Sequence, residues 1–211
     1  MSNLSKQLTK LGYSFKKIEN SIFMIYDFLT DSQVEELYSY ILSASDEDWE
    51  THYMEGVVGL AERKYGRTDL ENLLKEGLIE ITHHWKDKNL GMPHELSEPL
   101  AIKIKEIFSF DNTLKFDGVG TIQRQYSESP LPAHVDNHTD PSIEYAVIMY
   151  INDDYNDGEL YFSNLGIELK PLAKSLMIFP SHEGYKHGVK SPADGPVRYV
   201  MPSFVRKNNV S

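Results

Sequence analysis

The sequence of 211 residues contains no cysteine. Disulfide bonds, thiol catalysis and cysteine metal ligands are therefore excluded, and any metal must be held by His, Asp, Glu or backbone oxygen. No apolar run reaches the roughly eighteen residues of a membrane span, and residues 1–20 lack the continuous apolar segment of a secretory signal. These absences predict a cytoplasmic protein with no membrane partner.

Basic residues are also scarce, with 21 lysines and arginines against 32 aspartates and glutamates, and the formal net charge is −11. Such a surface repels phosphate backbones at long range, so nucleic acid is a poor candidate partner. Hydrophobic residues make up 40% and charged residues 25% of the chain, as in ordinary globular proteins. The length suits a single domain over residues 1–211 that can bury a sizeable core, present as a monomer or a homodimer.

The first part of the chain, about residues 1–114, is predicted to be mainly helical. Thr30–Gln33 is a capping-box pattern that begins a helix, and residues 21–29 read as a strand that leads into it. Apolar side chains follow at helical spacing: Val34, Leu37, Tyr38, Ile41 and Leu42. The start signal recurs at Thr68–Glu71, and a third helix is expected to begin at Ser97 with Pro99. Its apolar face consists of Leu100, Ile104, Ile107 and Phe108.

The pattern changes at about residue 115, where short segments rich in Ile, Val, Tyr and Phe alternate with Ser-Pro, Asn-Asp-Gly, Pro and Gly. These segments are 115–128, 143–152, 158–164, 167–171, 175–180, 186–190 and 197–205. The rhythm is typical of an antiparallel sandwich or barrel. We therefore predict an α+β fold in which a double-stranded β-helix (jelly-roll) core, about residues 115–206, carries the N-terminal helices on one sheet.

The segment LPAHVDNHTD, residues 131–140, holds a His-x-Asp motif at the end of a strand-like run. Residues i and i+2 of a strand point to the same face, so His134 and Asp136 can converge on one ion. Two histidines and one carboxylate leave three positions of a metal open, the arrangement of non-haem Fe(II) oxygenases. His187, which stands 53 residues later (187 − 134), is the candidate for the second histidine, and Arg198 follows it after 11 residues (198 − 187).

This order of residues resembles the 2-oxoglutarate/Fe(II) dioxygenases of the prolyl 4-hydroxylase type. The family shows a His-Val-Asp motif, a distal histidine such as His187, and a basic residue about ten positions further on, here Arg198. NDGELYF is similar to the family's turn and strand with a Gly-Gly-x-Leu core, although Asp157 replaces the first glycine. YDFLTDSQVEELYSYI resembles the family's opening strand and helix. The core resemblance covers about residues 117–206.

The resemblance implies a ligand set and a cosubstrate site. Three side chains would bind Fe(II): His134, Asp136 and His187. The cosubstrate, 2-oxoglutarate, would chelate the iron through its 2-oxo acid end, while Arg198 pairs with the far carboxylate through its planar guanidinium. Tyr150 and Tyr126 are implied to contact the cosubstrate. O2 is the second cosubstrate, and ascorbate is a candidate reductant.

The activity expected from the resemblance is hydroxylation of an unactivated C–H bond in a prolyl or other protein side chain, with succinate and CO2 as co-products. A free amino acid or another small molecule is the alternative substrate. A cupin-like module that binds a metal without catalysis is an alternative of another class. Loops around residues 50–95 and 137–143 are expected to select the substrate.

Several of these residues also have plainer interpretations. The two histidines and Asp136 could form a hydrogen-bonded network without a metal, and Arg198 could be a surface cation on a strand. Tyr126 and Tyr150 could be core aromatics, since tyrosine favours strands. The second triplet, residues 138–140, precedes a proline and is expected in a turn or loop rather than at the metal.

Two further residues carry expectations about the barrel. If Ile122, Arg124 and Tyr126 share a strand face, Arg124 looks into the barrel beside Tyr126, where a charge needs a partner. Arg124 would then bind a carboxylate of the substrate or form a structural salt bridge. Pro202 cannot donate to a strand ladder and therefore predicts an edge or an irregular strand end.

Overall fold

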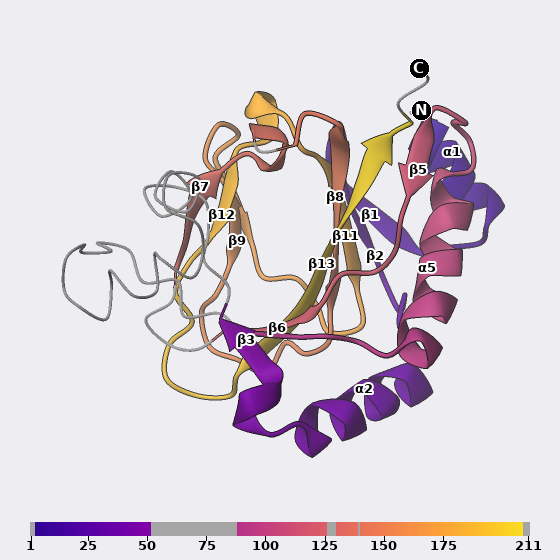
Figure 1. Ribbon diagram of the computed structural model, residues 1–211. Helices are drawn as coiled ribbons and strands as arrows, with labels where there is room; N and C mark the ends of the chain where they lie inside the picture. Colours follow the sequence, from indigo (N-terminus) through magenta and orange to yellow (C-terminus); the bar gives the residue numbers. More distant parts are fainter. Residues whose placement is uncertain (1–2, 52–87, 126–129, 139, 209–211) are drawn as a thin grey trace.

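The computed structural model describes residues 3–51, 88–125, 130–138 and 140–208 (Figure 1). Two antiparallel sheets face each other. The larger sheet has the strand order β1-β2-β11-β8-β13-β6-β4-β3, with β5 also paired to β13, and the smaller has the order β10-β9-β12-β7. No helix among the described residues is long and apolar enough to cross a membrane.

The strands of the larger sheet are β1 Phe15–Glu19, β2 Ile22–Ile25, β3 Trp49–Thr51, β4 Lys88–Leu90, β5 Leu114–Phe116, β6 Ile122–Gln125, β8 Ile143–Tyr150, β11 Leu176–Pro180 and β13 Arg198–Lys207. Those of the smaller sheet are β7 Leu131–His134, β9 Leu160–Phe162, β10 Ile167–Leu169 and β12 His187–Val189. The helices are α1 Asn3–Lys10, α2 Asp31–Ser43 and α5 His94–Phe108, and short 3₁₀ turns are η1 Asp46–Asp48, η2 Asp136–His138 and η3 Glu183–Tyr185.

Alternation along the central strands divides the apolar residues into two layers. In β8, Val147 and Met149 point to the outer face of the larger sheet, where they pack with residues of α1, α2 and α5. Ala146 and Tyr150 point to the inner face, where they pack with residues of the smaller sheet. Figure 1 shows the three helices along the side of the larger sheet that faces away from the smaller one. The predicted fold class, a double-stranded β-helix with helices on one sheet, is confirmed.

The helix α2 begins as the sequence predicts. Thr30 is the N-cap, its side chain accepts from the Gln33 backbone N–H, and the Gln33 side chain accepts in return from the Thr30 N–H. Leu37 and Ile41 are buried against the sheet. Leu42 was expected on the same face but is 81% exposed, so that part of the prediction is wrong. The start signal at Thr68–Glu71 lies outside the described residues.

The helix α5 begins earlier than predicted. Its first residue is His94 rather than Ser97, and Pro93 is the N-cap, whose carbonyl accepts from the Leu96 and Ser97 N–H groups. Pro99 therefore lies inside the helix instead of at its start, although proline lacks one backbone donor there. The predicted apolar face of Leu100, Ile104, Ile107 and Phe108 is buried, as expected.

The part before residue 115 contains strands as well as helices. The predicted strand in residues 21–29 is confirmed as β2, which pairs with β11, and β3 and β4 extend the other side of the same sheet. All seven predicted segments of the second half contain a strand. The single domain over residues 1–211 and its division near residue 115 stay predictions.

The strand β13 is central rather than marginal, which corrects the expectation for Pro202. Pro202 lies inside β13 and faces Ile148 of β8. On the other side of β13, pairing with β6 ends at Val200 and pairing with β5 starts at Val205. Pro202 therefore stands opposite the break between two neighbouring strands, where a missing N–H costs no ladder bond with either of them.

Candidate metal centre

The three predicted ligand residues come together at one end of the smaller sheet. His134 ends β7, His187 begins β12, and the two residues face each other in the ladder between these strands. Asp136 follows in η2. One ligand atom from each of the three side chains lies within 4.8 Å of the other two. Because Asp136 is in a 3₁₀ turn, the strand alternation by which we expected it to meet His134 is wrong, although the two side chains do converge.

The ring nitrogens are oriented for metal binding. The Nδ1 atoms of His134 and His187 lie 3.0 Å from the Pro132 carbonyl and 3.2 Å from the Tyr185 carbonyl. A carbonyl only accepts, so in each neutral ring Nδ1 carries the proton and Nε2 presents a lone pair. The two Nε2 atoms lie 3.3 Å and 3.8 Å from the carboxylate oxygens of Asp136. Such backbone contacts fix the tautomer and direction of metal-ligating histidines.

Burial and charge keep the group in the protonation states that a metal requires. Burial lowers the pKa of His187 to about 4, with the nearby Asp136 charge acting in the opposite direction, so this imidazole is neutral at pH 7. Burial alone would raise the pKa of Asp136. Its contacts with His134, His187 and Ser181 outweigh burial, and the pKa falls below its usual value. The site therefore offers an anionic carboxylate from Asp136 and a neutral imidazole from His187.

Ser181 belongs to this site and had no signal in the sequence. Its buried hydroxyl donates to Asp136 Oδ2 at 3.3 Å, and its carbonyl accepts from the Asn137 N–H at 3.2 Å. These contacts hold η2 against the end of β11. The rings of Phe162 and Phe179 pack on His187 with centroids 6.0 Å and 4.6 Å away, which gives the site an apolar wall.

Arg198 lies on the inner face of the larger sheet, at the start of β13, and is only 3% exposed. Its Nη1 donates to Gln125 Oε1 at 2.7 Å, and its Cζ lies 5.2 Å from the ring centroid of Tyr150 and 5.7 Å from that of Tyr155. In the described part of the chain it forms no ion pair with a carboxylate. The alternative of a surface cation is therefore excluded, and a buried guanidinium of this kind is stabilised by an anion.

Three buried polar groups around Arg198 donate to no acceptor within the described residues: the Tyr150 hydroxyl, the Tyr155 hydroxyl and Arg198 Nε. A buried polar group left without a partner costs about 1–3 kcal/mol. Burial raises the pKa of Tyr150 and of Tyr155, while the charge of Arg198 and its contact with the two phenol oxygens act in the opposite direction. Both phenols therefore stay protonated and can donate. A carboxylate has only acceptors and satisfies these donors, so the residues fit one end of a dicarboxylate.

Arg124 does not face the barrel interior, contrary to the expectation. It lies opposite Tyr199 in the ladder of β6 and β13, on the outer face of the sheet. Its guanidinium pairs with Asp46 Oδ1 at 2.7 Å and lies 4.3 Å from the ring of Trp49. The structural salt bridge, the alternative to a substrate contact, is what the structure contains.

The remaining candidates are placed or fall outside the structure. Tyr126 and the greater part of the substrate loop 50–95 lie outside the described residues. In the loop 137–143, His138 ends η2 and its Nε2 lies 3.4 Å from Glu183 Oε2. The Asp140 carboxylate accepts from the Ser142 hydroxyl and pairs with Arg206. Of the second triplet, the described residues His138 and Asp140 lie outside the strands, as predicted.

Comparison with known proteins gives a family for the core. A family model described as the 2OG-Fe(II) oxygenase superfamily matches residues 122–206, which contain the three ligand candidates and Arg198. No curated protein matches the chain.

Solved structures show the same fold. The viral collagen prolyl hydroxylase of Paramecium Bursaria Chlorella virus-1, in a 2OG complex, has a TM-score of 0.58 at 16% identity, covering 90% of this chain and 97% of its own. A Pseudomonas putida prolyl-4-hydroxylase has a TM-score of 0.54 at 15% identity, covering 98% and 100%. A prolyl hydroxylase from Trichoplax adhaerens, in complex with a hypoxia inducible factor peptide fragment, has a TM-score of 0.61 at 16% identity, covering 97% and 87%.

Residues 122–206 thus match the 2OG-Fe(II) oxygenase superfamily and contain the His-Asp-His cluster. This family implies Fe(II), 2-oxoglutarate and O2 as cofactor and cosubstrates. The chain shares its fold with the prolyl 4-hydroxylases over almost its whole length.

Proposed function

We propose that His134, Asp136 and His187 hold the ferrous ion and that Arg198 binds the far carboxylate of 2-oxoglutarate. The observation that carries this proposal is the convergence of three ligand atoms within 4.8 Å, in the same barrel as a buried arginine without a counter-ion in the described chain. Tyr150, whose ring packs on Arg198, adds a hydroxyl to the same carboxylate. Tyr126 stays a prediction for this pocket.

The residues of the site position and shield the reacting groups. Bound Fe(II), with 2-oxoglutarate and O2, supplies the oxidising power for hydroxylating an unactivated C–H bond, with succinate and CO2 as co-products. The protein holds both imidazoles with Nε2 free, keeps Asp136 anionic, and fixes the cosubstrate through Arg198. Phe162 and Phe179 exclude water from one side of the metal site.

The first experiment tests the metal and cosubstrate. Anaerobic addition of Fe(II) and 2-oxoglutarate to the purified protein is expected to give a weak visible charge-transfer band, and admission of air is expected to yield succinate. His187→Ala should abolish both signals because one ligand is lost. His138→Ala, an exposed histidine of η2, is the matched control and should retain them. If His187→Ala retains the band, the ligand assignment is wrong.

The substrate we propose is a prolyl or other side chain in a protein or peptide. The shared fold supports this choice, because the similar structures include enzymes named as collagen prolyl hydroxylase and prolyl-4-hydroxylase, and one complex with a peptide fragment. Mass spectrometry of proline-containing peptides and of free amino acids, incubated with the enzyme and its cosubstrates, should show a gain of one oxygen in the peptides.

The same screen decides between the alternatives. A gain of one oxygen only in free amino acids would indicate a small-molecule hydroxylase. A stable complex with iron and 2-oxoglutarate that never yields succinate in air, with any substrate offered, would indicate a non-catalytic cupin-like module.

A further inference from the structure

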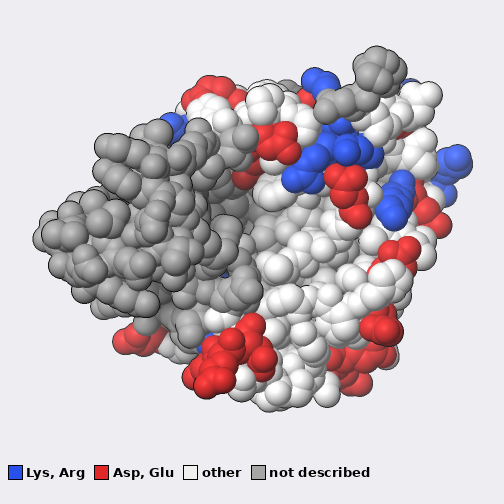
Figure 2. All heavy atoms as spheres, viewed as in Figure 1, with Lys and Arg blue, Asp and Glu red and all other residues white. Residues whose placement is uncertain are grey.

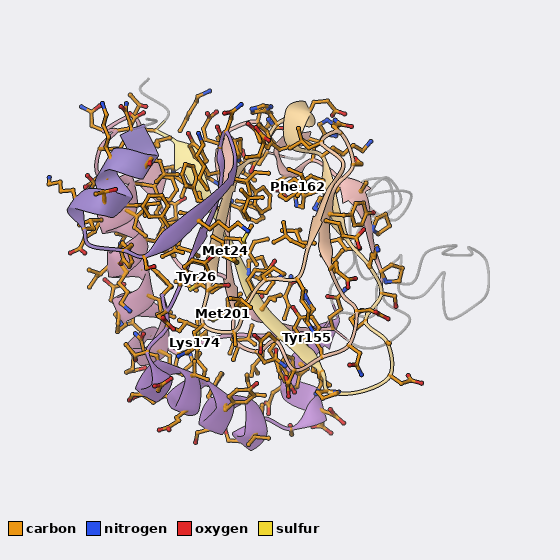
Figure 3. The ribbon with its side chains drawn as sticks, turned by 180° about the vertical axis from the view of Figure 1, so that it is seen from behind. Met24, Tyr26, Tyr155, Phe162, Lys174 and Met201 are labelled. Carbon is orange, nitrogen blue, oxygen red and sulfur yellow. The ribbon has the colours of Figure 1, made fainter. Side chains whose placement is uncertain are left out.

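Tyr155 is a buried residue of the loop between β8 and β9 that the sequence did not single out. It is fully buried, and its ring centroid lies 5.7 Å from Arg198 Cζ. Figure 3 shows it well apart from Phe162, whose ring contacts His187. Tyr155 therefore lies beside the residue proposed to bind the far carboxylate of the cosubstrate.

The conformation of the loop between β8 and β9 places Tyr155 close to Arg198. Gly158 has a φ of +72°, and a Cβ there would stand 3.2 Å from Tyr155 Cε2 and 3.4 Å from Arg198 Cδ. Only glycine combines that backbone conformation with such an approach at little cost. Lys170 donates its Nζ to the Tyr155 carbonyl and lies 4.6 Å from the ring centroid, which holds the loop from the other side.

The hydroxyl of Tyr155 is unexplained by packing. It is buried and its O–H donates to no acceptor within the described residues, as is also true of the Tyr150 hydroxyl. A phenylalanine would fill the same space without burying an unsatisfied donor. A hydroxyl held beside a buried arginine indicates a partner that enters from outside the chain.

From these observations we infer that Tyr155 is a second tyrosine donor to the far carboxylate of 2-oxoglutarate. The inference rests on the proposed function, in which Arg198 and Tyr150 bind that group. A carboxylate has two oxygens with about four acceptor positions, enough for the arginine fork and two phenolic hydroxyls. Tyr155 acts by positioning the cosubstrate and by selecting 2-oxo acids with a second carboxylate.

The test is the affinity for 2-oxo acids, measured anaerobically with Fe(II) from the charge-transfer band or by calorimetry. Tyr155→Phe is expected to weaken 2-oxoglutarate binding by about tenfold, because a hydrogen bond to a charged group is lost. Binding of 2-oxobutyrate, which has the same 2-oxo acid end but no second carboxylate, is expected to be unchanged, as is binding of Fe(II). Tyr199→Phe is the matched control: it is the neighbour of Arg198 on β13 but faces outward, and it should change neither affinity.

A second measurement separates this role from a structural one. Without ligand, Tyr155→Phe should melt at the same temperature as the wild type or higher, since the variant removes an unsatisfied buried hydroxyl. A lower melting temperature of the ligand-free variant, unchanged 2-oxoglutarate affinity, or an equal loss for both 2-oxo acids would overturn the inference. A wild-type protein that binds no 2-oxoglutarate would instead overturn the proposed function.

Discussion

Ser181 contributes a single hydroxyl to the candidate metal centre. It is buried at the end of β11 and donates to Asp136 Oδ2 at 3.3 Å, the oxygen that also faces His187. A group that orients a ligand carboxylate in this way contributes to metal affinity without touching the metal.

We expect Ser181→Ala to lower the affinity for Fe(II) by about 10- to 100-fold, since the Asp136 carboxylate loses its orienting donor. Calorimetric titration with Fe(II) or Mn(II) measures the effect. Ser203→Ala is the control, because Ser203 is equally buried but its hydroxyl accepts from the Gly120 N–H on the outer side of β13. Equal metal affinity in the two variants would mean that the 3.3 Å contact has no role in binding.

Asp140 is the residue whose charge should make stability depend on pH. Hydrogen bonds from Ser142 and Arg206 lower the pKa of its carboxyl from 3.8 to about 2. The unfolded chain therefore binds this proton at a higher pH than the folded protein, so the stabilisation is complete above about pH 4 and disappears as the pH falls through about 2. The side chain is 41% exposed, so solvent reduces the size of the effect.

Urea unfolding of Asp140→Ala and the wild type tests this. We expect the variant to be less stable by a constant amount from pH 7 down to about pH 4, and the difference to shrink below that. Glu47→Ala, an exposed acid of η1 without an ion pair in the described chain, is the control and should show no such trend. A difference that stays constant down to pH 2 would exclude a role for the Asp140 charge.

At the scale of elements, the close approach of a loop to β13 makes one glycine essential. A Cβ on Gly120 would stand 2.1 Å from the Pro202 carbonyl oxygen, whereas nothing lies within 4 Å of a Cβ on Gly118. The loop between β5 and β6 lies against β13 at this point, where neither of the two strands pairs with it.

Gly120→Ala should therefore destabilise the protein by about 1–3 kcal/mol, as overpacking against a backbone atom usually does. Gly118→Ala, two residues away in the same loop, is the matched control and should change stability by less than about 0.5 kcal/mol. Free energies of unfolding in urea give both values. Equal stability of the two variants would contradict the close approach of Gly120 to the Pro202 carbonyl.

The elements that could be predicted are those specified by neighbouring residues. The capping box at Thr30 and the alternating strands of the second half are local patterns, and both are found. The start of α5 was missed because its N-cap, Pro93, makes no side-chain hydrogen bond. The shared face of Ile122 and Arg124 was correct, but which face lines the barrel depends on the pairing of β6 with β13, a long-range contact that alternation does not contain.

The site residues that belong to a sequence motif could be predicted. Those that reach the site only through tertiary contacts could not. His134, Asp136, His187 and Arg198 follow an ordered pattern, and the structure brings the first three together. Ser181 and Tyr155 carry no motif. They reach the site because η2 folds against β11 and because the β8–β9 loop turns inward at Gly158.

At the scale of the whole molecule, basic and acidic side chains gather over different elements. Figure 2 shows Lys and Arg gathered near β5 and the end of β13, and acidic groups gathered over η1. Among the basic side chains, Arg206 lies 3.0 Å from Asp140, and Lys207 lies 2.6 Å from Glu144. The basic cluster is therefore largely neutralised by neighbouring carboxylates.

Ligand binding should stabilise the entire fold, because the proposed metal ligands lie at the end of the smaller sheet and Arg198, the proposed cosubstrate residue, lies in the larger one. With Fe(II) saturating and 2-oxoglutarate at 100 times its dissociation constant, the cosubstrate adds about 2.7 kcal/mol, which raises the melting temperature by about 5–10 °C for a chain of this size. Anaerobic scanning calorimetry measures it. His187→Ala is expected to gain nothing, and a wild-type melting temperature independent of 2-oxoglutarate would contradict the prediction.

The pairing of β2 with β11 has a consequence for how the protein is made. Leu176 lies opposite Ile25 across 151 residues of sequence (176 − 25). The strand β2 is therefore synthesised long before its partner β11. Until β11 emerges, the apolar β2 has an open edge on that side, which invites pairing with other nascent chains. Translation that stalls before residue 176 should therefore leave an aggregation-prone fragment, and the cell must protect this enzyme most during the last part of its synthesis.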